Sequence, residues 1–320
     1  MKKLIIQIPC YNEEGTLPTT LAALPREVSG VDRVEWLIID DGSTDQTVEV
    51  GKDHGVDYSV SHRKNLGLAR AFMTGIHACL DRGADIIVNT DADNQYCADD
   101  IPKLIQPILR GEAEIVVGAR AIGEIEHFSP VKKFLQQLGS WTVRIASKTD
   151  IPDATSGFRA FSRGAAKQLN VFNNYTYTLE TIIQAGQKEI PIKWVPIRTN
   201  KYLRPSRLIK SIPSYIRQSV ITILRIFVVY KPFRFFMSIG AVLFAVGTLL
   251  GLRFLYNYLG GGGSGHIQSL ILASILIGIG FQTIIVAFIA DLLSVNRRLL
   301  EDLQHRKRED DLKKKVMISD

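Results

Sequence analysis

The fold is decided by residues 86–95, IIVNTDADNQ, in which a short apolar run passes directly into closely spaced acids. The first four of these residues are typical of a buried strand, and Asp91 and Asp93 follow its end. Two carboxylates on one turn can hold a hard divalent cation that also binds a diphosphate, with Gln95 as a third oxygen ligand. A strand-ending turn with solvated acids would look the same, so the interpretation depends on the rest of the chain.

Three further apolar runs end in polar turns, at Leu4–Ile8, Trp36–Ile39 and Glu114–Val117. Helix-like segments lie between the runs, among them Leu66–Leu80 and Ile101–Leu109. Strands that alternate with helices predict an α/β fold, with a largely parallel sheet covered on both faces. Ligands of such sheets bind at the carboxyl ends of the strands, so we expect the acidic turns to converge in space.

The second half of the chain is far more apolar than the first. Phe235–Leu252 and Ile267–Ala290 contain no charged residue, and each is long enough to cross a bilayer as a helix. A buried helical hairpin is the alternative, although soluble cores rarely need two such runs close together. The apolar run after Met1 is too short for a secretory signal peptide. We therefore count the two later runs as the spans and expect a multi-pass protein of the cell membrane.

Basic residues lie before the first predicted span and after the second, whereas the connection 260–266 contains no Lys or Arg. By the positive-inside rule, both termini are expected in the cytoplasm. Much of the net charge of +7 lies near these spans, where anionic lipid headgroups are a sufficient partner, so we expect no nucleic-acid partner. The three cysteines show no metal-ligand spacing, which suits a reducing compartment. The flanking basic residues are Lys231, Arg234, Arg297, Arg298, Arg306, Lys307 and Arg308.

Six short motifs occur in order along the first half of the chain. They are IPCYNEE (8–14), DDGSTD (40–45), NLG (65–67), DADNQ (91–95), GAR (118–120) and SGFR (156–159). This set resembles the family 2 glycosyltransferases, in particular the branch of dolichol-phosphate mannose synthase and bacterial polyprenyl-phosphate glucosyltransferases. The resemblance implies a GT-A fold, the Rossmann-like fold of nucleotide-diphospho-sugar transferases, and a single displacement that inverts the anomeric centre.

The resemblance also implies roles for individual residues. Asp91, Asp93 and Gln95 would hold Mg²⁺ or Mn²⁺ on the donor diphosphate, and Arg120 would lie near the phosphates. Asp93 and Arg120 are therefore candidate catalytic residues, together with Glu180, which lies where relatives often place an acid near the acceptor. Whether Glu180 is a base, an organiser of the phosphate site or a surface charge stays open. The residues implied to frame the nucleotide are Pro9, Tyr11, Glu13, Asp40, Asp41, Asp91 and Ala92.

The nature of the acceptor determines which further residues the reaction needs. A hydroxyl acceptor requires a general base, whereas a lipid phosphate is already ionised and has to be positioned and electrostatically matched. Basic residues are therefore expected between the site and the membrane, and a cluster that only touches lipid headgroups is the alternative. The candidates for the acceptor phosphate are Arg198, Arg204 and Arg207, Lys132 and Lys133 in a predicted loop after Arg120, and Ser156 of the SGFR motif.

The chain is predicted to divide into four parts. Between the catalytic residues and the spans, Ile216, Val220 and Ile223 recur at helical spacing, which predicts an amphipathic helix in the membrane interface. Packing of this helix on the catalytic domain or on a partner subunit is the alternative. The predicted parts are a GT-A catalytic domain (1–205), the interfacial helix region (206–232), a transmembrane hairpin (233–293) and a charged cytoplasmic tail (294–320).

The predicted function is transfer of one hexose or N-acetylhexosamine from a nucleotide-diphospho-sugar to polyprenyl phosphate at the cytoplasmic membrane face. A UDP-sugar is favoured as the donor, and GDP-mannose stays open. A processive polysaccharide synthase is a second interpretation, although residues 137–141, QLGSW, lack the arginine of its usual motif. A non-catalytic membrane scaffold is a third interpretation. By analogy with relatives that have paired spans, a homo-tetramer also stays open.

Overall fold

The computed structural model describes residues 1–120, 130–171, 177–200, 212–260 and 267–319. The chain divides into two compact units. The first unit comprises Met1–Ser219 and His305–Asp320, and the second comprises Val220–Gln304. The predicted limits of the four parts of the chain stay a prediction.

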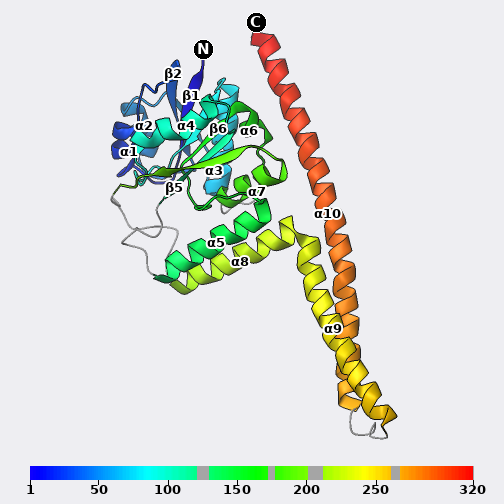
Figure 1. Ribbon diagram of the computed structural model, residues 1–320. Helices are drawn as coiled ribbons and strands as arrows, with labels where there is room; N and C mark the ends of the chain where they lie inside the picture. Colours follow the sequence, from blue (N-terminus) through cyan, green and yellow to red (C-terminus); the bar gives the residue numbers. More distant parts are fainter. Residues whose placement is uncertain (121–129, 172–176, 201–211, 261–266, 320) are drawn as a thin grey trace. The chain divides into compact units, whose positions relative to one another are not determined.

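A seven-stranded sheet forms the centre of the first unit, with the strand order β3-β2-β1-β4-β6-β5-β7 (Figure 1). Strand β6 runs antiparallel to both of its neighbours, and the other paired strands are parallel. The predicted α/β class and GT-A-like sheet are therefore confirmed. The strands are β1 (Lys3–Cys10), β2 (Arg33–Asp40), β3 (Tyr58–Ser61), β4 (Ile86–Asn89), β5 (Ile115–Arg120), β6 (Arg159–Ser162) and β7 (Ile192–Ile197).

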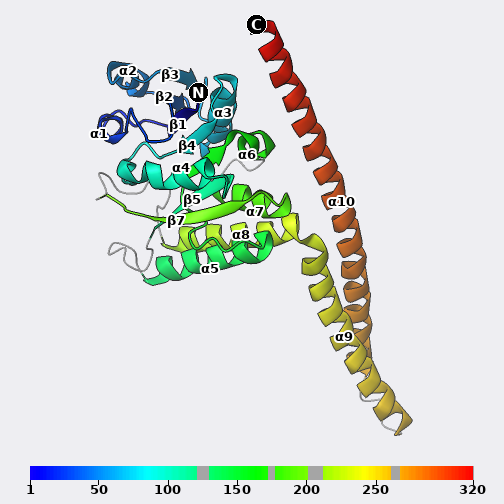
Figure 2. The same cartoon turned by 45° about the horizontal axis from the view of Figure 1, so that its top comes forward.

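Helices cover both faces of the sheet, and each face has its own apolar core (Figure 2). Successive side chains of a strand point to opposite faces, so Leu4, Ile6 and Ile8 pack with α1 and α4, whereas Ile5 packs with α3 and α6. This burial on both sides explains why the strands read as nearly continuous apolar runs. The helices of this unit include α1 (Leu17–Ala23), α2 (Thr47–Asp53), α3 (Leu68–Asp81), η1 (Ala98–Asp100), α4 (Ile101–Leu109), α5 (Pro130–Ser147), α6 (Arg163–Gln168) and α7 (Thr178–Gln187).

One expectation about this unit was wrong. Lys132 and Lys133 were expected in a loop after Arg120, but both lie in the first turns of α5. Helix α5 has a strong amphipathic pattern despite its polar composition, and its buried face includes Val143 and Ala146. Tertiary packing of such a face stabilises a helix that its residue composition alone would not predict.

The second unit contains the two most apolar helices of the chain. Helix α9 (Pro232–Leu259) and the segment Ile267–Arg297 of α10 each contain an 18-residue stretch of high mean hydropathy, 2.2 and 2.4, and both are long enough to cross a membrane. Helix α10 (Ile267–Ser319) does not end with its apolar part but continues as one helix through the predicted charged tail. Helix α8 (Ile212–Tyr230) forms as predicted, and its interfacial position stays a prediction.

Small residues allow α9 and α10 to pack closely side by side (Figure 1). A Cβ atom added to Gly240 would lie 2.9 Å from the carbonyl oxygen of Gly280, and one added to Gly247 would lie 2.9 Å from the backbone nitrogen of Ile277. Ala273 and Ala287 of α10 are likewise buried. Contacts of this kind are typical of helices that associate in a bilayer, where close backbone approach replaces the hydrophobic driving force.

Candidate active site

The turns that follow β1 and β2 are joined into one structure at the carboxyl edge of the sheet. Cys10 pairs with Asp40 in the register of the two strands. Beyond this pair, the backbone N–H of Asn12 donates to the hydroxyl of Ser43 at 2.9 Å, and that of Glu13 donates to the hydroxyl of Thr47 at 2.8 Å. The motifs IPCYNEE and DDGSTD therefore form one continuous surface, as the parallel topology predicts.

Asp41 is buried and organises a third loop at this edge. Its carboxylate accepts hydrogen bonds from the backbone N–H groups of Leu66 and Gly67, at 2.9 and 2.8 Å. The ring of His62 lies 2.7 Å from the same carboxylate and 2.9 Å from the hydroxyl of Thr74. Asp41 therefore binds the NLG motif directly and joins it to the loop that follows β2.

Asp40 and Gly42 complete this corner. Asp40 is buried, and one of its carboxylate oxygens accepts a hydrogen bond from the backbone N–H of Ser43 at 2.9 Å. Gly42 has φ +75°, and an added Cβ atom would lie 2.6 Å from the carbonyl carbon of Lys64. Glycine is thus required where the two loops meet. The nucleotide contacts of Pro9, Tyr11, Glu13, Asp40, Asp41 and Ala92 stay a prediction.

The half-buried acids Asp91 and Asp93 follow β4 at the same edge. Burial, to which the neighbouring Asp93 carboxylate adds, raises the pKa of Asp91 to about 7, although Arg120 and a hydrogen bond from Tyr96 oppose this shift. Asn94 has φ 54°, and the backbone N–H of Gln95 donates to Asp93 at 3.1 Å. The pair is thus a site of negative charge that its surroundings only partly compensate.

The residues present fit a divalent cation that shares its coordination with a ligand. Within the described ranges, no cluster of three or more His, Cys, Asp or Glu side chains has the geometry of a metal site. Mg²⁺ is nevertheless commonly held by one or two carboxylates, with waters and substrate phosphates completing the shell. Asp91, Asp93 and the Gln95 amide match that donor set, and their role as ligands stays a prediction.

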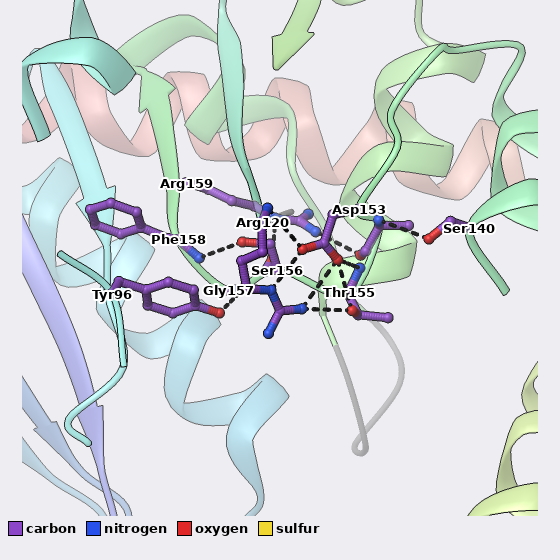
Figure 3. A network of polar contacts seen from close by, with 10 residues as sticks. Tyr96, Arg120, Ser140, Asp153, Thr155, Ser156, Gly157, Phe158 and Arg159 are labelled. Atoms are coloured by element: carbon purple, nitrogen blue, oxygen red, sulfur yellow. Dashed lines mark hydrogen bonds and ion pairs between the residues drawn. The ribbon is translucent and has the colours of Figure 1, made fainter. Parts of the chain in front are cut away.

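Arg120 ends β5 and is held by a buried carboxylate, as Figure 3 shows. Its Nε lies 2.7 Å from one oxygen of Asp153, its Nη2 lies 3.1 Å from the other, and Nη2 also donates to Thr155 at 2.9 Å. Burial alone would raise the pKa of Asp153, but the Arg120 guanidinium and the hydrogen bonds hold that pKa below its ordinary value. Arg120 is therefore a fixed cation close enough to lower the pKa of Asp91.

The SGFR loop lies against the acidic pair through Gly157. The backbone N–H of Gly157 donates to the Tyr96 hydroxyl at 2.9 Å, and its carbonyl accepts from the Asn89 amide at 2.9 Å. The same amide donates to the Tyr177 hydroxyl at 2.8 Å. Sequence reasoning missed Asn89 and Tyr177. The signal for Asn89 was a polar residue at the end of an otherwise apolar strand.

Arg159 is fully buried and connects this loop to α7. Its guanidinium donates to the carbonyl oxygens of Ser156, Thr178 and Ala154 at 2.8, 2.7 and 2.9 Å, and also to the hydroxyl of Thr181. Burial lowers the pKa of Arg159 to about 10, so the side chain stays charged at neutral pH. Glu180 lies half-buried in the first turn of α7, and its role stays a prediction.

The residues predicted to bind the acceptor phosphate differ in their burial and in their hydrogen-bond partners. The side chain of Arg198 is 60% exposed, and its Nη2 lies 2.9 Å from the buried carboxylate of Asp100. Ser156 is fully buried, and its hydroxyl accepts a hydrogen bond from the backbone N–H of Phe158 at 3.3 Å. The side chains of Lys132 and Lys133, and all of Arg204 and Arg207, lie outside the described residues. Binding of an acceptor phosphate by any of them stays a prediction.

Comparison with known proteins shows which family the chain belongs to. Residues 5–169 match the model of Glycosyl transferase family 2. A UDP-N-acetylglucosamine–dolichyl-phosphate N-acetylglucosaminyltransferase of Methanococcus voltae is 32% identical over 219 residues, which cover 62% of this chain and 86% of the relative. An undecaprenyl-phosphate mannosyltransferase of Micrococcus luteus is 28% identical over 175 residues, which cover 53% of this chain and 70% of the relative.

A solved structure supports the fold. The crystal structure of glucosyl-3-phosphoglycerate synthase from Mycobacterium tuberculosis, in complex with phosphoglyceric acid, superposes with a TM-score of 0.55 at 22% identity. The alignment covers 70% of this chain and 80% of that one, and identity at this level shows the fold alone. The match of the family model to more than half of the chain shows the family. The chain belongs to glycosyl transferase family 2.

Proposed function

We propose that this protein transfers one hexose or N-acetylhexosamine from a nucleotide-diphospho-sugar to polyprenyl phosphate at the cytoplasmic face of the membrane. The observation that carries the proposal is the acidic pair Asp91 and Asp93, poorly compensated and close to the fixed cation Arg120. That combination suits a cation-bound diphosphate as leaving group. Two helices of membrane-spanning length in the same chain support a lipid-linked acceptor.

The chemistry requires stabilisation of negative charge on the departing diphosphate. The bond between the anomeric carbon and the diphosphate breaks, and the nucleoside diphosphate leaves with the electron pair. A phosphate oxygen of the acceptor attacks the opposite face of the same carbon, which inverts its configuration. When bound at Asp91, Asp93 and Gln95, Mg²⁺ or Mn²⁺ supplies positive charge next to the diphosphate. Arg120 is pre-positioned by Asp153 to stabilise the same developing charge without reorganisation.

The acceptor proposal explains why no strong base is required. A phosphate monoester is largely ionised at neutral pH, so no proton has to leave the nucleophile. Glu180 then organises the acceptor side rather than removing a proton. Arg198, Arg204, Arg207, Lys132 and Lys133 are the cations available to match the acceptor phosphate. The names of the relatives support this class of acceptor, because they specify dolichyl phosphate and undecaprenyl phosphate.

The donor and the placement in the membrane complete the proposal. A uridine diphosphate donor is favoured because the Methanococcus relative is named for UDP-N-acetylglucosamine. Helix α9 and the apolar part of α10 would form the two spans, with both termini in the cytoplasm. Helix α8 would lie in the interface and keep the site at the height of the lipid phosphate.

The experiment uses the full-length protein in detergent or nanodiscs. It is incubated with polyprenyl phosphate, Mg²⁺ or Mn²⁺, and a panel of UDP- and GDP-sugars, and the glycolipid product is measured. Metal-dependent product is expected from the wild type and from Asp150→Ala, whose side chain is 93% exposed, but not from Asp93→Ala. Nucleotide binding without transfer to any lipid phosphate would refute the acceptor assignment.

A further inference from the structure

The chain that leaves β7 is tied to the turn that follows the acidic pair. The backbone N–H of Cys97 donates to the carbonyl of Arg198 at 3.2 Å, and Tyr96 and Thr199 form an antiparallel bridge. Next to this bridge, the backbone N–H of Asn200 donates to the carbonyl of Gln95 at 2.9 Å. We call these two segments, residues 94–97 and 198–200, the clasp. It joins stretches that are far apart in the sequence.

The end of the clasp beside the acids is held by one side chain. The amide nitrogen of Asn200 lies 3.0 Å from the carbonyl oxygen of Asn94 and 3.2 Å from that of Tyr96. It also lies 3.4 Å from the side-chain oxygen of Asn94. All three partners are acceptors, so they require a donor with two N–H groups at this position. The other end of the clasp is held separately, by Arg198 on Asp100.

Asn94 occupies a backbone conformation that needs support. Its φ of 54° lies in the left-handed region, which is unfavourable for a residue with a Cβ atom. Asn94 stands between Asp93 and Gln95, so its backbone angles set the directions in which both neighbouring side chains leave the chain. A hydrogen bond to the carbonyl of Asn94 therefore acts on the geometry of both candidate ligands at once.

We propose that Asn200 is a positioning residue for the cation site. By holding Asn94 in the left-handed conformation, Asn200 fixes Asp93 and Gln95 in the arrangement that binds a divalent cation. The inference rests on the proposed function only in taking these two residues as cation ligands, and it requires nothing of the acceptor. Substitution of a residue that orients metal ligands from outside the coordination shell typically weakens metal binding by about ten- to a hundredfold.

The test measures Mn²⁺ binding to the full-length protein without acceptor. Free Mn²⁺ is followed by electron paramagnetic resonance during titration, in the presence of UDP and, separately, of GDP. Asn200→Ala is expected to weaken Mn²⁺ binding by about tenfold or more. Thr199→Ala is the matched control, because the Thr199 side chain is exposed and the residue enters the clasp through its backbone bridge. Unchanged Mn²⁺ affinity in Asn200→Ala would overturn the proposal.

A second pair of variants tests whether Asn200 acts through Asn94. Glycine adopts the left-handed conformation readily, so in an Asn94→Gly background the further change Asn200→Ala is expected to weaken Mn²⁺ binding by only about threefold or less. An equal loss in both backgrounds would overturn the proposed route. Asn200→His keeps one N–H donor and is expected to retain tighter Mn²⁺ binding than Asn200→Ala. Absence of transfer by the wild type would refute the proposed function but leave these binding results interpretable.

Discussion

Gly157 lies where a side chain cannot be accommodated without moving the candidate cation site. A Cβ atom added there would lie 2.9 Å from the hydroxyl of Tyr177 and 3.0 and 3.1 Å from the two carboxylate oxygens of Asp91. These distances are a few tenths of an ångström shorter than ordinary contacts. Tyr177 has little freedom to retreat, because its ring stacks on Phe72 with a centroid distance of 3.9 Å and its hydroxyl binds Asn89. The displacement in Gly157→Ala therefore falls mainly on Asp91.

We expect an effect on both folding and catalysis. Overpacking of this degree lowers stability by about 1–3 kcal/mol. Misplacement of a catalytic group by up to an ångström reduces rates by as much as about a hundredfold, so we expect Gly157→Ala to lose about ten- to a hundredfold in transfer rate. The Mn²⁺ concentration for half-maximal activity should rise with it.

The assay compares initial rates of glycolipid formation across a Mn²⁺ titration, together with thermal unfolding of each variant. Gly139→Ala is the control, because an added Cβ atom there meets nothing within 4 Å. A transfer rate for Gly157→Ala equal to that of the wild type would refute the reasoning. So would a loss of activity explained entirely by unfolding at the assay temperature.

Three further predictions concern the pH dependence, the spans and the buried polar network. Asp153→Asn should lower stability by about 3–5 kcal/mol, because it leaves a buried guanidinium unpaired. Folding lowers the pKa of Asp153, so its ion pair stabilises the wild type above about pH 4 and is lost as pH falls through the folded-state pKa. Folding also lowers the pKa values of Asp45 and Asp100, so unfolding measured across pH should show a smaller acid loss of stability in Asp153→Asn than in the wild type or in Asp150→Asn, rather than none. Gly240→Ala should lower the unfolding temperature in detergent, with a loss of about 1–3 kcal/mol, whereas Gly251→Ala, with nothing within 4 Å of its added Cβ atom, should not. Tyr177→Phe keeps the stacked ring but removes a buried hydroxyl, so we expect about 1–2 kcal/mol less stability and a smaller loss of transfer than in Gly157→Ala; equal losses would contradict this ranking.

The elements with strong local patterns could be predicted from the sequence. The strand at Ile86–Asn89 and the helix at Ile101–Leu109 have the predicted limits, because an apolar run and an amphipathic period mark them clearly. Strand β6 escaped prediction because its four residues, RAFS, carry no such pattern. They form a strand because β4 and β5 supply partners on both sides. That information is non-local.

Helix α10 illustrates a different limit. The change in composition after Arg297 marks the end of the apolar segment, but not the end of the helix. The residues beyond Arg297 are rich in Glu, Lys, Arg and Leu, which have high helix propensity and allow the helix to continue. Composition thus predicted two apolar helices long enough to cross a membrane and missed the continuity of the last helix.

The sequence predicted the site residues that belong to short motifs. It did not predict the isolated residues that hold those motifs in place. The acids of the DADNQ motif were found from their position at a strand end, and Arg120 was found from the family resemblance. Asn89, Tyr177 and Asn200 were missed, because their partners lie far away along the chain. An isolated polar residue acquires its meaning only when folding brings its partner within hydrogen-bonding distance.

The buried guanidinium of Arg159 has a consequence for protein engineering. It donates to the backbone carbonyl oxygens of Ala154 and Ser156 in the SGFR loop and of Thr178 at the start of α7, which lies about twenty residues further along the chain. The guanidinium therefore fixes the loop and the start of α7 to each other, although they are separate in the sequence. Chimaeras between relatives will need to preserve the backbone paths of residues 154–159 and 178–181 together, since a displaced carbonyl group would leave a charged group in the interior without its acceptor.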